Sequence, residues 1–93
     1  MLVVGESMTP EFEDGDVIIV EPGAPVKDGS FVIALSQGQW TFRQLRRQGQ
    51  GWWLCPLHCG FPSVELTDLG LIRGVVIQKS RPGRRSATRH DLA

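Results

Sequence analysis

Residues 5–20 have the sequence GESMTPEFEDGDVIIV, which combines two tight turns, an isolated hydroxyl group and an apolar run. Gly5 allows backbone angles closed to other residues, the proline lacks an N–H group, and Gly15 between two aspartates supplies a second turn. The run after the second turn is rich in valine and isoleucine, which favour a buried strand. The segment therefore predicts that Ser7 lies on a loop between apolar segments.

A serine hydroxyl on a rigid turn can attack a substrate carbonyl while neighbouring backbone N–H groups form an oxyanion hole. Ser7 is thus a candidate nucleophile, and Met8, which follows it, is the candidate turn and oxyanion residue. A serine two residues after a glycine is more commonly only a turn former. The spacing alone leaves both interpretations open.

Outward from this segment, short apolar runs alternate with turn residues along the whole chain. The sequence contains 11 glycines and 6 prolines, and no ten-residue window has apolar residues at helical spacing. The pattern predicts an all-β fold, in which sheet closure or a coiled sandwich-like barrel buries both faces. Strands are expected at residues 2–4, 16–21, 30–35, 40–46, 52–55, 64–66 and 70–78, the last one interrupted at Gly74 as at a bulge or a corner.

The length of 93 residues suits one small domain, and the formal net charge is zero. Seven acidic side chains against one lysine lie in residues 1–30, whereas nine basic against three acidic side chains lie in residues 31–93. We expect the domain to span residues 1–78 and residues 79–93 to form a basic, disordered tail, either solvated or lying on nucleic acid or an acidic partner. No apolar run approaches the roughly 20 residues of a membrane helix, and no signal peptide is evident. These features predict a soluble, cytoplasmic protein.

The segment Cys55-Pro56-Leu57-His58-Cys59 contains thiol and imidazole groups, which are the ligands that zinc prefers. A structural zinc site needs four ligands, and the only other histidine, His90, lies in the predicted tail. We therefore expect free thiols, with no metal and no other cofactor.

Several separated segments together resemble the carboxyl-terminal domain of LexA and of phage cI-type repressors, which shares its fold with type I signal peptidases. The resemblance covers residues 2–78 and rests on the motifs Ser-Met-Thr-Pro at Ser7, Asp-Gly-Asp at Asp14, the strand 41–45 and the segment 54–62. It implies a coiled, mostly antiparallel β structure. His58 and Phe61 stand where an asparagine and a tyrosine are common in the family.

In that family the serine that corresponds to Ser7 attacks a peptide bond, and a lysine on a later strand is its general base. Here the family's Thr-x-Lys-x-Leu segment is TFRQL, with Arg43 in place of the lysine. A guanidinium group has a pKa above about 12 and stays charged at neutral pH, so it could bind an anion but not accept the serine's proton. Lys27 and Lys79, the two lysines present, fall in a turn and at the start of the predicted tail.

Three functions compete on these grounds. The first is a regulatory and self-association domain of a LexA-like or phage-repressor-like transcriptional regulator without autoproteolysis. For this function the resemblance implies a homodimer that contacts DNA only through an amino-terminal domain absent from these residues. The second is an active serine peptidase of the LexA and signal-peptidase type that uses another base. The third is an unrelated β-barrel that binds nucleic acid through its arginines and tail, with Trp40, Trp52 or Trp53 as stacking surfaces.

Overall fold

The computed structural model of the chain describes residues 1–80 and 90–91. Within these residues nearly all regular structure is β-sheet, which confirms the predicted all-β class. The elements, in chain order, are β1 (Val17–Glu21), β2 (Phe31–Ser36), β3 (Gln39–Gln48), β4 (Gly51–Cys55), β5 (Val64–Leu66), the short 3-10 helix η1 (Leu69–Leu71), β6 (Ile72–Ser80) and β7 (His90–Asp91). Within the described residues no helix could cross a membrane.

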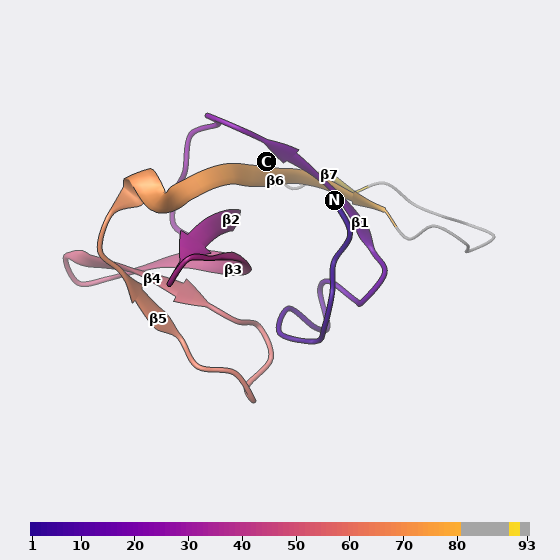
Figure 1. Cartoon of the computed structure of the whole chain (residues 1–93), viewed down its shortest axis with the longest axis horizontal. Helices are drawn as coiled ribbons and strands as arrows, with labels where there is room; N and C mark the ends of the chain where they lie inside the picture. The colour runs from indigo at the N-terminus through magenta and orange to yellow at the C-terminus, as the bar shows by residue number, and fades with distance from the viewer. Residues whose placement is uncertain (81–89, 92–93) are drawn as a thin grey trace.

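All strand pairs are antiparallel and form one coiled sheet in the order β1-β6-β2-β3-β4-β5, with β7 also paired to β6 (Figure 1). Four consecutive strands, β2 to β5, form a meander, in which a two-residue turn at Gln37 and Gly38 joins β2 to β3 and a second tight turn joins β3 to β4. β6 is the long central strand that returns to pair with both β1 and β2. β6 thereby connects β1 to the meander that begins at β2.

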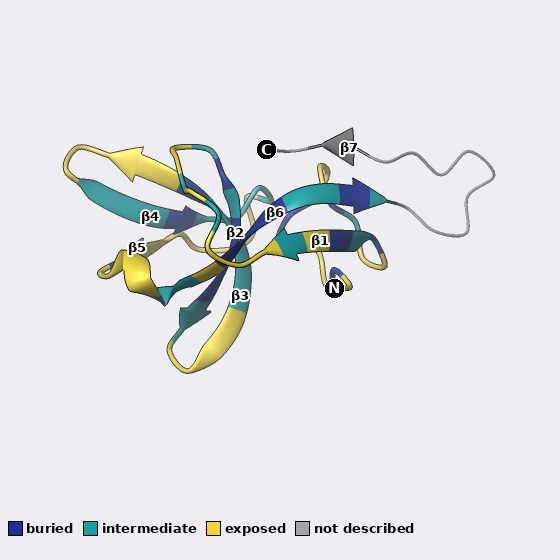
Figure 2. Ribbon diagram, turned by 90° about the horizontal axis from the view of Figure 1, so that it is seen from above, coloured by how far each residue is buried: buried dark blue, intermediate teal, exposed yellow. Residues whose placement is uncertain are grey.

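The sheet buries both of its faces, which explains why several strands are continuous apolar runs. Along β2, Val32 and Ala34 belong to one core cluster while Ile33 between them belongs to the other. Val75 and Val76 of β6 divide between the two clusters in the same way. Buried residues gather on β2 and β6, whereas the tips of the hairpins are exposed (Figure 2).

Gly74 lies where β6 changes its register with β2, since Ile33 pairs with Gly74 but Ala34 pairs with Ile72. The predicted irregularity at this glycine is therefore observed. A Cβ atom at Gly74 would come within 2.3 Å of Cγ1 of Val20 on the neighbouring strand β1. Only a residue without a side chain allows the two strands to approach this closely.

The described chain departs from the expected strands at both ends. The predicted strand at residues 2–4 is reduced to a single bridge between Leu2 and Val17, which is flanked by hydrogen bonds from Ile18 N to the Met1 carbonyl and from Val3 N to the Asp16 carbonyl. At the other end β6 continues to Ser80, two residues beyond the predicted domain boundary. Most of the predicted disordered tail, residues 81–89 and 92–93, lies outside the described residues.

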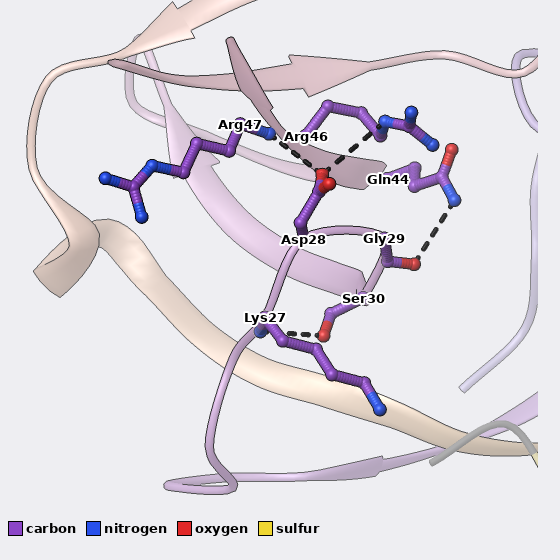
Figure 3. Close-up of polar contacts among 7 residues, drawn as sticks. All are labelled: Lys27, Asp28, Gly29, Ser30, Gln44, Arg46 and Arg47. Carbon is purple, nitrogen blue, oxygen red and sulfur yellow. Dashed lines mark hydrogen bonds and ion pairs between the residues drawn. The ribbon is translucent and has the colours of Figure 1, made fainter. Parts of the chain in front are cut away.

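The turn before β2 is attached to β3 by polar contacts (Figure 3). Asp28 Oδ1 accepts a hydrogen bond from Arg47 N at 2.9 Å and lies 3.6 Å from Arg46 Nε, and Gln44 Nε2 donates to the carbonyl of Gly29. The guanidinium of Arg47 lies 5.6 Å from the ring centre of Trp52. The nucleic-acid alternative relies on the three arginines of β3, Arg43, Arg46 and Arg47. Two of them, Arg46 and Arg47, already make contacts within the domain.

Candidate functional site

The loop that carries Ser7 is closed by hydrogen bonds between the two predicted turns. Gly5 N donates to Asp14 Oδ1 at 2.8 Å, and Gly15 N donates to the carbonyl of Val3 at 2.8 Å. Gly5 and Gly15 have φ values of 86° and 90°, which L side chains rarely adopt. The glycine and aspartate residues of the quoted segment thus hold the loop against the strand that follows it.

Two large apolar side chains attach the same loop to the core. Met8 is 1% exposed and Phe12 is 0% exposed. Phe12 makes edge-to-face contacts with Phe31 and Phe42, with ring centres 4.9 and 4.8 Å apart. Because Phe42 precedes Arg43 on β3, this aromatic cluster fixes the position of the Ser7 loop relative to Arg43.

The segment 56–62 supports the loop from a second side, a role that the sequence did not predict. The backbone N–H groups of Leu57 and His58 both donate to the carbonyl of Ser7, at 2.9 and 3.0 Å. The ring of His58 packs edge-to-face against Phe61 and accepts a hydrogen bond from Gly60 N through Nδ1. In residues 1–80 no group of three histidine, cysteine, aspartate or glutamate side chains could hold a metal ion.

The side chains of Ser7 and Arg43 are in direct hydrogen-bond contact. Arg43 Nη1 donates to Ser7 Oγ at 2.9 Å and to the carbonyl of Phe42 at 2.7 Å. Partial burial lowers the pKa of Arg43 from its ordinary value. A guanidinium group begins from a pKa above about 12, so Arg43 remains a hydrogen-bond donor at neutral pH and Ser7 Oγ is its acceptor.

A cavity of about 220 Å³ opens beside this pair. Its wall consists mainly of apolar side chains from the first four residues and from the start of β3, and Ser7 and Arg43 supply its principal polar groups. The remaining lining residues are Met1, Leu2, Val3, Val4, Ile18, Ile33, Trp40, Thr41 and Phe42.

The two lysines have other roles in the described chain. Lys79 is 7% exposed, and its Nζ donates to the carbonyl of Glu11 and to Glu11 Oε1, the latter at 2.9 Å. Lys27 is exposed in the turn before β2. Neither residue lines the cavity beside Ser7.

Comparison with known proteins identifies the family of the chain. Residues 1–77 match the model of the Peptidase S24-like family. The chain belongs to that family. Among its relatives, the prophage repressor CohE of Escherichia coli K12 is 35% identical over 88% of this chain and 38% of its own length.

Two further relatives have similar coverage. The LexA repressor of Corynebacterium efficiens is 31% identical over 80% of this chain and 32% of its own length, and the HTH-type transcriptional regulator for conjugative element R391 of Providencia rettgeri is 36% identical over 80% and 34%. The chain thus spans about a third of the length of these relatives. The predicted resemblance to LexA and phage repressors is confirmed.

Proposed function

We propose that this S24 domain is the carboxyl-terminal regulatory and self-association part of a transcriptional regulator, and that it lacks autoproteolysis. In this proposal Ser7 occupies the nucleophile position, Met8 the turn and oxyanion position, and Arg43 the position of the family's general-base lysine. DNA contact would belong to another domain of the regulator. The names of the relatives, a prophage repressor, a LexA repressor and an HTH-type regulator, support the regulatory role.

The hydrogen bond from Arg43 Nη1 to Ser7 Oγ is the observation that best supports the proposed lack of autoproteolysis. A serine needs a neutral base to accept its proton as it attacks a carbonyl, and such assistance is worth roughly 10²–10⁴ in rate. Arg43 instead points a donor at the oxygen that would have to lose its proton. Burial lowers the pKa of Arg43, but a guanidinium group stays protonated in proteins at neutral pH and cannot serve as the base.

Covalent labelling tests this proposal directly. The chain is incubated with a serine-directed phosphonate across neutral and alkaline pH, and adducts are measured by intact-protein mass spectrometry. We expect no labelling above that of a Ser7→Ala control at any pH. Labelling that rises with pH and disappears in Ser7→Ala would show that another base activates Ser7, and the peptidase function would replace the inactive one.

Replacing Arg43 with Lys restores the family pattern and provides a second measurement. The new amine can act as a base only if the partly buried site lowers its pKa toward neutrality. If activity appears, it should require Ser7 and should rise with the deprotonation of the new lysine. Labelling of Arg43→Lys that persists after Ser7→Ala is combined with it would mean that the adduct forms elsewhere.

A further inference from the structure

Arg43 carries a positive charge that no acidic side chain of residues 1–80 neutralises. The ion pairs in this part of the chain join Arg46 to Asp28 and Lys79 to Glu11, and no carboxylate oxygen of residues 1–80 lies within 4.0 Å of the Arg43 guanidinium. Both partners of Arg43 Nη1 are neutral oxygens. A guanidinium has five N–H donors in a planar fork, so donors remain for the two oxygens of a carboxylate.

A second cavity shares part of its lining with the cavity beside Arg43. The second cavity has about 230 Å³ and is lined by Met1, Val20, Ile33, Trp40 and Arg73, three of which also line the first. Neither lining contains an aspartate or a glutamate. We refer to the two cavities together as the groove. Its wall is mainly apolar and includes the guanidinium groups of Arg43 and Arg73, which suits an apolar ligand that carries negative charge.

The backbone beside the groove favours a peptide over other apolar anions. In the described sheet, residues 39–43 of β3 pair with β2 alone, because the pairing of β3 with β4 begins at Gln44. One edge of β3 at Trp40–Arg43 is thus open, and its N–H and C=O groups can pair with an extended chain. The same four residues line the cavity.

We propose that the groove binds the free carboxyl terminus of an apolar peptide, with the carboxylate on Arg43 and Ser7 Oγ and the terminal apolar side chains against Trp40. This ligand accounts for the uncompensated guanidinium, the apolar wall and the open strand edge together. The inference rests on the proposed function. In an active peptidase such a carboxylate would be a reaction product that is released, whereas a domain without proteolysis can keep it as a ligand. Binding would make the S24 domain a reader of peptide ends.

A matched pair of peptides tests the proposal. The intact chain is titrated with acetyl-Ala-Val-Leu bearing a free carboxylate and with the same peptide as its carboxamide, and binding is followed by NMR at the Trp40 indole N–H and the Arg43 Nε–H. We expect the acid to bind about tenfold more tightly than the amide, the difference that one charge-assisted hydrogen bond gives. Equal affinities, or no shift of either signal, would overturn the proposal.

Substitutions of two arginines on β3 test which residue is responsible for the preference for the peptide acid over its carboxamide. Arg43→Gln should abolish the preference for the acid, and Arg43→Lys should retain part of it. Arg46→Gln removes an equal charge from β3 beside Asp28 and should leave the preference unchanged. Loss of the preference in Arg46→Gln, or its survival in Arg43→Gln, would contradict the assignment to Arg43.

Two further arms separate this proposal from its alternatives. Octanoate carries a carboxylate and an apolar chain without backbone N–H groups, and we expect it to bind more weakly than the peptide acid. Equal binding of octanoate would overturn the assignment to a peptide. The titration is repeated in Ser7→Ala, where an acid preference supports the carboxylate site even if labelling of the natural chain had contradicted the proposed loss of proteolysis.

Discussion

Lys79 places a charged amine in the interior beside the Ser7 loop, with its Nζ 5.0 Å from the ring centre of Phe12 and bonded to Glu11. The exposed fraction is 7% for Lys79 as a whole, so the ammonium depends on these partners instead of water. The sequence could not predict this burial, because the residues around Lys79 are polar and basic. The contact joins residues 68 positions apart, which no local pattern encodes.

At this scale we predict that Lys79→Ala lowers the free energy of unfolding by about 1.5–3 kcal/mol, the usual worth of hydrogen bonds to a charged group. Lys27→Ala is the matched control, since it removes the other lysine from an exposed position and should change stability by less than about 0.5 kcal/mol. Urea unfolding followed by tryptophan fluorescence measures both. Equal, small effects of the two substitutions would show that the Lys79 contacts contribute little.

At the scale of the elements, the strands were largely predictable and their relative positions were not. Apolar runs between glycine and proline turns located β1 to β6 to within a few residues, because each run is flanked by residues that end a strand. The return of β6 to pair with both β1 and β2 depends on contacts between distant segments. The support of Ser7 by the segment 56–62 is of the same kind, since backbone N–H groups give no sequence signal.

At Gly74 the irregularity predicted from the sequence coincides with a close approach of β6 to β1. Gly74→Ala would place a Cβ atom 2.3 Å from Val20 Cγ1, and the β-branched valine has little freedom to move away. We predict a loss of about 1–3 kcal/mol in the free energy of unfolding, the usual cost of overpacking. In Gly51→Ala, at the start of β4, the nearest atom is 3.6 Å away and the loss should be much smaller.

Combining Gly74→Ala with Val20→Ala distinguishes a steric clash from a general intolerance of β6. Removing the valine methyl groups takes away the atom that the new Cβ meets, so the double variant should lose less stability than the sum of the two single variants. Thermal unfolding of the four proteins completes this cycle. Strictly additive losses would contradict the close approach of β1 and β6.

At the scale of the whole molecule, two groups of exposed apolar side chains stand out, apart from Ile19 on β1 and Leu69 in η1. Leu2, Val4 and Trp40 border the groove beside Ser7, and Phe61 and Val64 lie in and beside β5. β5 pairs only with β4 among the described strands, so it is an open edge of the sheet. If the groove binds peptide ends, the β5 edge with Phe61 and Val64 beside it is a candidate surface for self-association, because an open edge pairs readily with a second chain.

We therefore predict a two-fold symmetric dimer that forms through β5, the commonest symmetry of soluble homo-oligomers. Val64→Lys places a charge on that edge and should weaken the dimer by tenfold or more in its dissociation constant, roughly the effect of 1.4 kcal/mol. Trp40→Lys places the same charge beside the groove and should leave dimerisation unchanged. Sedimentation velocity over a hundredfold range of concentration measures all three proteins. A natural chain that stays monomeric at the highest concentration would rule out self-association, and weakening by Trp40→Lys alone would move the interface to the groove and put it in competition with the peptide.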